Sequence, residues 1–360
     1  MNSLLYVLAA ILVFGLLVAV HELGHFLAAK ACGVRVNEFS IGMGPELWST
    51  ERGETQYSLR ALPVGGFCAL EGEDEESDDE RALNRQGFWK KLIIFAAGAT
   101  MNLLTGFLIL LLLYSGASAF RVPAIAGGAP EFEQNNGVTL EADDIFWKIN
   151  GERVYLYSDV ELLLELNRGQ PLDLVVMRNG EKVTLNDLKY TTYTDQQGQP
   201  YQGYGIYRDI SQWEEATPGV ILKNSLVNTV GFVRLVRLSF KMLFSGAAGV
   251  KDLSGPVGIV STMTEVGEQA EEVGGVLAAL ESILYFGAML AVNLAVMNLL
   301  PLPALDGGHI LLLFVNAAAM ALFGKKVPQK YESFINGAGF VLLMGLMLLI
   351  TFNDVSKLLS

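Results

Sequence analysis

The chain has 360 residues, of which 51% are hydrophobic and only 18% are charged, whereas soluble domains carry about a quarter charged residues. This composition favours a membrane protein over an ordinary soluble one. The net charge of −13 argues against nucleic acid as a partner, because neutralising phosphates requires a basic face.

The first predicted element is a transmembrane helix over residues 1–31, in which the run Leu4–Val20 is apolar. A helix needs about 20 apolar residues to cross the hydrocarbon core of a bilayer. The segment could be taken for a secretory signal, but it has no charged n-region and no clear cleavage site. We therefore expect it to be a retained membrane helix.

This first helix ends on HELGH, which places His21 and His25 on one helix face, about one turn apart. Two imidazoles at this spacing can bind one Zn²⁺ and leave positions for a third ligand and water. Glu22 is then the candidate catalytic base, since its carboxylate can take a proton from that water. The alternative is that both histidines only form hydrogen bonds within the helix bundle. However, charged groups at membrane depth are costly, which favours a functional site.

Residues 32–91 are predicted to form a cytoplasmic loop that contains a β-hairpin. Thr55–Leu62 alternates apolar and polar residues as a strand does, and Pro63 with Gly65-Gly66 then turns the chain. Several Lys and Arg residues in this loop place it on the cytoplasmic side. We interpret the acidic run Glu71–Glu80 as a solvated loop, because it lacks the ligand spacing of an EF-hand calcium site.

The chain contains only two cysteines, Cys32 and Cys68. Their positions provide neither a disulfide framework nor a CxxC metal motif.

A second transmembrane helix is predicted over residues 92–119, followed by an extracytoplasmic mixed α/β domain over residues 120–205. Turn signals at Asn150-Gly151 and Asn179-Gly180 flank a predicted helix over Asp159–Asn167. The order DDIFWKINGERV, helix, PLDLVVMRNGEKVTL resembles a PDZ domain, although Ala142 stands where such domains usually have Gly, and AGGAP is not a standard ligand loop. A PDZ groove binds a peptide by adding a strand to a sheet edge.

Residues 206–282 are predicted to form an extracytoplasmic linker with an interfacial amphipathic helix over Leu222–Phe244. Arg234, Arg237 and Lys241 form one polar stripe on this helix, a pattern typical of helices that lie in the membrane interface. The same segment is long enough to span the membrane, which is the alternative.

A third, interrupted transmembrane helix is predicted over residues 283–323, because Pro301 and Pro303 remove amide donors within an apolar segment. A fourth is predicted over residues 336–352. The intervening loop carries Lys325, Lys326 and Lys330, so it is expected to be cytoplasmic. The fold class is thus a polytopic α-helical membrane protein with four transmembrane helices, an inserted mixed α/β PDZ-like domain and a short membrane-associated β-hairpin.

Asp306 follows the helix break in PLPALDG and is the candidate third zinc ligand. If the first and third helices both enter from the outer side, His21 and Asp306 reach a similar depth near the cytoplasmic edge of the hydrocarbon. Broken backbone at that depth has to line a polar cavity. His309, three residues later, is the alternative ligand, with a packing role otherwise.

Four motifs together resemble the site-2 protease family: HELGH, FSIGMGP, SGPVGI at Ser254–Ile259 and NLAVMNLLPLPALDGGH. The similarity is to the bacterial RseP-like branch, here with one PDZ-like domain, and it covers nearly the whole chain. It implies that His21, His25 and Asp306 bind Zn²⁺ and that Glu22 is the catalytic base.

The same resemblance implies that Asn293 and Asn298 contact the substrate backbone; an interhelical hydrogen bond is the alternative. It also implies that the β-hairpin pairs with an extended substrate, whereas a plain cytoplasmic hairpin would have no such role.

The expected function is that of a zinc-dependent intramembrane endopeptidase in the bacterial plasma membrane, with its active site near the cytoplasmic side. The resemblance implies single-pass membrane substrates, such as anti-sigma factors or remnant signal peptides. A catalytically silent PDZ-containing membrane adaptor is the alternative, and a zinc carrier is a further one. An adaptor has no need of Glu22, and a carrier requires polar residues in more of the spans.

Overall fold

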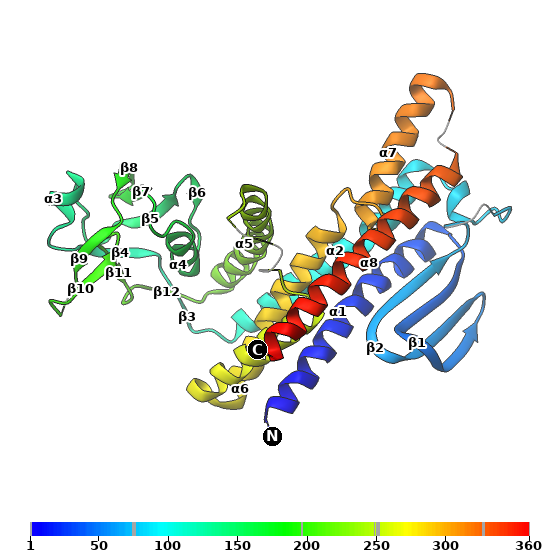
Figure 1. Ribbon diagram of the computed structural model, residues 1–360, viewed down its shortest axis with the longest axis horizontal. Coiled ribbons are helices and arrows are strands. Elements are labelled where there is room, and N and C mark those ends of the chain that lie inside the picture. Colours follow the sequence, from blue (N-terminus) through cyan, green and yellow to red (C-terminus); the bar gives the residue numbers. More distant parts are fainter. Residues whose placement is uncertain are drawn as a thin grey trace. The chain divides into compact units, whose positions relative to one another are not determined.

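The computed structural model describes residues 2–73, 77–195, 197–247, 249, 253–325 and 328–359. Part of the acidic run Glu71–Glu80 and the loop position Lys326 lie outside the described residues. The chain divides into two compact units, a helical unit (Met1–Leu110 with Phe232–Ser360) and a sheet unit (Leu111–Gly231). Figure 1 labels the elements of both.

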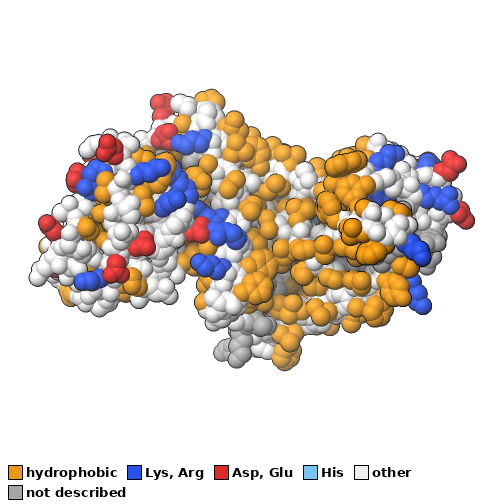
Figure 2. Space-filling view, turned by 90° about the horizontal axis from the view of Figure 1, so that it is seen from above, with side chains coloured by type: hydrophobic (Ala, Val, Ile, Leu, Met, Phe, Trp, Pro, Cys, Tyr) orange, Lys and Arg blue, Asp and Glu red, His pale blue; other side chains and the backbone are white. Residues whose placement is uncertain are grey.

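Among the described residues, six helices are long and apolar enough to cross a membrane. They are α1 (Asn2–Cys32), α2 (Phe88–Ser115), α5 (Pro218–Ser245), α6 (Pro256–Asn298), α7 (Asp306–Phe323) and α8 (Gln329–Leu359). Figure 2 shows hydrophobic side chains gathered over the helices of the helical unit. Such an apolar surface is expected where lipid replaces water. The sequence prediction has four spans because it treats α5 as interfacial and joins the end of α6 to α7.

Helix α6 is a helical hairpin that the sequence analysis does not predict. Gly275 interrupts it with φ 75° and ψ −171°, and a Cβ placed on Gly267 would lie 3.0 Å from Ile283 Cδ1. The two limbs, residues 256–274 and 276–298, therefore pack antiparallel. The first limb falls in the predicted linker 206–282, where glutamates such as Glu265, Glu268 and Glu271 lower the hydropathy of the segment.

The second limb of α6 packs alongside α1. Leu17 clusters with Leu290 and Ala291, and nearer the N-terminus of α1, Tyr6 and Ala10 cluster with Ile283. Residue numbers rise together along both helices, so the two run parallel. This packing brings the end of α6 to the level at which α1 carries HELGH.

The first limb of α6 is held at its beginning by the last helix. The buried carboxylate of Asp354 on α8 accepts hydrogen bonds from the backbone amides of Gly255 and Gly258, each at 2.9 Å. These amides belong to the start of α6, where helix N–H groups have no intrahelical partner. A negative charge at this end is also favoured by the helix dipole.

The strands β1 (Val36–Arg52) and β2 (Thr55–Leu70) form a long, bent antiparallel hairpin that follows α1. Phe39 of β1 pairs with both Tyr57 and Cys68 of β2, so β2 flanks this part of β1 on both sides. The predicted strand Thr55–Leu62 is thus only the first half of β2, which continues to Leu70. Residues 66–70 form one outer edge of the resulting sheet.

A hydrophobic cluster joins this hairpin to the helices. Val36 and Leu70 of the hairpin pack with Ala29 of α1 and Ile94 of α2, and Ile310 of α7 lies against the same cluster. The start of α7 is therefore tied to the end of α1 by apolar packing, because all of these side chains share one core.

The sheet unit contains an antiparallel sheet in the order β11-β4-β5-β7-β8, with β6 paired to β5. Its strands are β4 (Ala124–Gly128), β5 (Ile145–Ile149), β6 (Glu152–Arg153), β7 (Leu172–Arg178), β8 (Glu181–Leu188) and β11 (Ile206–Asp209). Helices α3 (Phe132–Asn136) and α4 (Tyr157–Leu166) connect them, and two further antiparallel strand pairs are β9 (Thr191–Thr194) with β10 (Pro200–Gly203) and β3 (Ala119–Arg121) with β12 (Trp213–Glu215).

Both predicted turns of the sheet unit are confirmed. Asn150-Gly151 joins β5 to β6 and Asn179-Gly180 joins β7 to β8, with positive φ at all four residues. Two-residue hairpin turns with positive φ favour Asn-Gly, because both residues adopt the left-handed region at low cost. The predicted helix Asp159–Asn167 corresponds to α4.

We expect Gly275→Ala to destabilise the helical unit by about 1–3 kcal/mol, because the backbone conformation at this bend is accessible essentially to glycine alone. Gly337→Ala is the matched control, since a Cβ there meets open space on a helix and should be neutral or stabilising by about 0.5–1 kcal/mol. Thermal unfolding of both variants in detergent measures the difference. Equal unfolding midpoints would show that the hairpin bend is not strained by a side chain.

Candidate metal centre

Helix α1 presents His21 and His25 on one face, as the spacing predicts. Their side chains are nearly buried, with 10% and 11% of their surface exposed. His25 Nδ1 lies 2.8 Å from the carbonyl oxygen of Ile94 on α2, to which it can donate. This bond leaves Nε2 of His25 directed at the site.

Asp306 is the first residue of α7, after the chain breaks between Asn298 and Asp306. Pro301 and Pro303 cannot donate backbone hydrogen bonds, so α6 cannot continue through this segment. Ala304 has a positive φ of 67° there. A carboxylate in the first turn of a helix is stabilised by the helix dipole, which makes Asp306 a favourable starting residue for α7.

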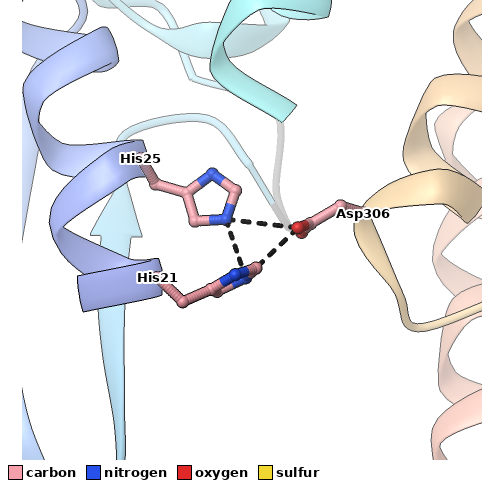
Figure 3. Close-up of side chains that lie close together, drawn as sticks. All are labelled: His21, His25 and Asp306. Carbon is pink, nitrogen blue, oxygen red and sulfur yellow. Dashed lines mark hydrogen bonds and ion pairs between the residues drawn. The ribbon is translucent and has the colours of Figure 1, made fainter. Parts of the chain in front are cut away.

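The three side chains converge on one point (Figure 3). The Oδ2 atom of Asp306 lies 3.2 Å from Nε2 of His21 and 3.4 Å from Nε2 of His25, and the two Nε2 atoms are 3.2 Å apart. Among the described residues, this is the one group of three or more His, Cys, Asp or Glu side chains close enough to hold a metal ion together.

These separations fit a zinc ion. Ligand bonds of about 2.0–2.1 Å in tetrahedral geometry place donor atoms about 3.3 Å apart, and the observed values are 3.2, 3.2 and 3.4 Å. Oδ2 of Asp306 is also buried without a hydrogen-bond partner among the described residues. A buried carboxylate oxygen requires compensation, which a cation between the three donors would provide. Two imidazoles and one carboxylate are a donor set typical of catalytic zinc sites.

Helix α2 contributes the space that the imidazoles occupy. A Cβ placed on Gly98 would lie 2.3 Å from Nε2 of His25 and 2.6 Å from Cε1 of His21. Both distances are far below van der Waals contact, so no other residue fits without moving the rings. Gly24 on α1 likewise allows the backbone of α2 to approach, since its Cβ would lie 2.5 Å from the Ala97 carbonyl oxygen.

The polar cavity beside the three side chains has a volume of about 250 Å³ and is lined in part by Glu22, Asn102, Asn298 and Leu305. The predicted catalytic residue Glu22 therefore opens onto the same space as His21 and Asp306. Strand β2 approaches this side chain, since a Cβ placed on Gly66 would lie 3.5 Å from Cγ of Glu22.

The two predicted asparagines differ in position. Asn298 places its Nδ2 atom 3.2 Å from Nε2 of His21 and lines the cavity. Asn293, five residues earlier, is half-buried but is not among the residues that line this cavity. A separation of five residues turns about 140° around a helix, so the two side chains cannot share one face.

Asn102 on α2 is a site residue that the sequence analysis missed. It is 0% exposed, lines the cavity and lies 3.5 Å from Nδ1 of His21. The signal was present in the sequence, because an amide side chain within an apolar span is costly and is seldom kept without a partner.

The alternative ligand His309 lies outside the group of three donors. Its ring stacks on Phe95 with the centroids 5.0 Å apart. Cys68 is likewise not in the group, and burial together with the nearby charge of Glu22 raises the pKa of its thiol. A thiol that stays protonated is a poor metal ligand.

The chain is similar to known peptidases over nearly its whole length. Residues 9–346 match the profile described as Peptidase family M50. The chain is 36% identical to a candidate zinc metalloprotease of Clostridium perfringens, over 98% of both chains. It is 29% identical to the zinc metalloprotease RasP of Geobacillus kaustophilus and 26% identical to the regulator of sigma-W protease RasP of Bacillus subtilis, again over 98% of both chains.

We expect Gly98→Ala to lower proteolytic activity by about 100-fold, since misplacing a catalytic group by about 1 Å has an effect of that size. The added methyl group overlaps the positions of both imidazoles, so bound zinc should fall as well. Gly87→Ala, just before α2, is the control, because a Cβ there meets nothing within 4 Å. Unchanged zinc content and activity in Gly98→Ala would contradict the close packing of α2 on the histidines.

Proposed function

This chain belongs to peptidase family M50, and from that membership we propose that it is a zinc-dependent endopeptidase that cuts transmembrane segments of single-pass membrane proteins. The expected resemblance to the site-2 proteases is confirmed by the family match. The observation that carries the proposal is the convergence of His21, His25 and Asp306 beside Glu22 in one cavity.

In this proposal His21, His25 and Asp306 hold the zinc ion, and Glu22 transfers a proton from water to the leaving group. A zinc ion at this point supplies Lewis-acid chemistry, polarising the scissile carbonyl and making water acidic enough to attack near neutral pH. Glu22 takes a proton from the attacking water and passes it to the departing amide nitrogen, as a general base and then a general acid.

Asn298 is proposed to bind the substrate backbone. Its amide group lies at the cavity wall beside His21, where a donor can stabilise negative charge that develops on the attacked carbonyl oxygen. Asn293 remains a weaker candidate for substrate contact, because it does not line the cavity.

The β1–β2 hairpin could present an unwound substrate to the metal centre. Peptide bonds within a helix are shielded by their own hydrogen bonds, so a transmembrane segment has to become extended before cleavage. Residues 66–70 of β2 form an outer sheet edge, and a Cβ on Gly66 would lie only 3.5 Å from Cγ of Glu22. An extended segment paired with this edge would run beside Glu22.

The sheet unit is proposed to be PDZ-like and to dock or filter substrates. A groove of about 530 Å³ runs between α4 and the edge strand β11, with Glu161, Arg168, Tyr204 and Arg208 on its walls. A groove between a helix and an unpaired sheet edge suits an extended peptide. Gly203, the last residue of β10, and Gly205 line this groove. The AGGAP segment, residues 126–130, is not among the residues that line it.

We further propose that the protein lies in the bacterial plasma membrane with its active site near the cytoplasmic side, as the distribution of Lys and Arg in the loops predicts. Four transmembrane helices, with α5 in the interface, remain our proposed topology. The name of the Bacillus subtilis relative refers to regulation of sigma-W, which supports membrane-tethered anti-sigma factors as one substrate class, beside remnant signal peptides.

A catalytically silent membrane adaptor is the second candidate, and the groove of the sheet unit is the observation that favours it. An adaptor would bind peptides at the groove without needing Glu22 at the metal centre. The two functions therefore differ in what a change at Glu22 does.

We expect Glu22→Gln to reduce cleavage of a model transmembrane segment by about 10²–10⁴-fold, the usual contribution of a general base. Bound zinc should remain, because the amide is nearly isosteric and Glu22 is not among the three donors. The measurements are zinc content of the purified full chain and cleavage in detergent or liposomes. His25→Ala is the control and should lose both zinc and activity. A wild-type chain that binds zinc but cleaves no better than Glu22→Gln would favour the adaptor.

A further inference from the structure

Asn102 on α2 is in an unusual state for a buried amide. The side chain is 0% exposed, and its Nδ2 atom faces Nδ1 of His21 at 3.5 Å. Its Oδ1 atom is buried without a hydrogen-bond partner among the described residues. Buried polar atoms are nearly always paired, so the orphaned oxygen needs an explanation.

His25 shows which hydrogen bond a metal-binding histidine makes at this site. Nε2 of each imidazole faces Asp306, so a histidine that binds metal there carries its hydrogen on Nδ1 and has to donate it to an acceptor. His25 donates to the carbonyl oxygen of Ile94 at 2.8 Å. Two turns along the same face of α2, Asn102 occupies the corresponding place for His21.

The nitrogen and oxygen of an amide are assigned from their hydrogen bonds rather than seen directly. With Oδ1 turned towards His21, the amide oxygen accepts the Nδ1 hydrogen and is no longer without a partner. We infer that Asn102 is a positioning residue that accepts the Nδ1 hydrogen of His21 and thereby holds Nε2 ready for zinc. This inference rests on the proposed zinc site.

Asn298 is the competing partner of His21, but its geometry does not suit this role. Its Nδ2 atom lies 3.4 Å from Nδ1 and 3.2 Å from Nε2 of the same ring. An atom almost equidistant from both ring nitrogens cannot lie along the Nδ1–H direction, which points away from Nε2. Asn298 therefore remains available to bind the substrate, while Asn102 holds the imidazole of His21.

A bond between helices is the other role open to Asn102. Membrane helices are commonly joined by asparagine side chains, and such a bond would stabilise the contact of α1 with α2 whether or not metal is present. The positioning role instead predicts an effect on zinc affinity that depends on a hydrogen-bond acceptor at this position.

The experiment measures the zinc affinity of the full chain in detergent, by competition with a chromogenic chelator. Asn102→Leu keeps the branching at Cγ and removes the acceptor, and should weaken zinc binding by about 10–100-fold, as loss of a partner to a metal-bound histidine usually does. Asn102→Asp keeps an acceptor and should bind zinc within about threefold of wild type, as carboxylate–histidine–zinc triads do. Thr100→Val, on the exposed face of α2, is the control and should change nothing.

Thermal unfolding of the metal-free variants separates positioning from packing. If Asn102 positions His21, the unfolding midpoints of the metal-free wild type and variants should stay close together. The rise in midpoint on adding zinc should then be smaller in Asn102→Leu alone. Wild-type zinc affinity in Asn102→Leu, or equal losses in the Leu and Asp variants, would overturn the positioning role while leaving the zinc site intact. A wild-type chain that binds no zinc would instead overturn the proposed function itself.

Discussion

Three donor atoms from distant parts of the chain lie within 3.4 Å of one another in the helical unit. Bringing these atoms together is energetically costly, because it buries the Oδ2 atom of Asp306, which has no hydrogen-bond partner among the described residues. Such an arrangement is unfavourable unless a cation compensates it. Much of the helical unit can be understood as the framework that keeps Asp306 and the two histidines at one depth.

That framework uses parallel packing of α1 against the second limb of α6. The contacts from Tyr6 to Leu17 and from Ile283 to Ala291 set the longitudinal register of the two helices. Asn298 then ends α6 beside His21, and the break that follows lets α7 begin at Asp306. The cluster that includes Ala29, Ile94 and Ile310 fixes the lateral position of α7.

Helix α2 acts as the third wall of the site through one row of residues spaced four apart. Ile94 offers a carbonyl oxygen to His25, Gly98 leaves room for both rings, and Asn102 faces His21. Residues at this spacing lie on one helix face, so a single straight helix can hold both imidazoles. The β1–β2 hairpin completes the site from another side, where Gly66 lies close to Glu22.

The sequence by itself determined the local parts of this protein: the apolar helices, the HELGH face, the helix break before Asp306 and the Asn-Gly turns of the sheet unit. These features depend on residues close together in the chain, whose spacing and hydropathy can be read directly. Tertiary structure alone decided which polar residues meet. The hairpin of α6 was missed because its glutamates mask the apolar pattern, and β2 runs past its predicted end because its second half pairs with β1 from the other side. Likewise, Asn298 rather than Asn293 lines the cavity, and Asn102 faces His21, because such contacts depend on how whole helices pack and rotate against one another.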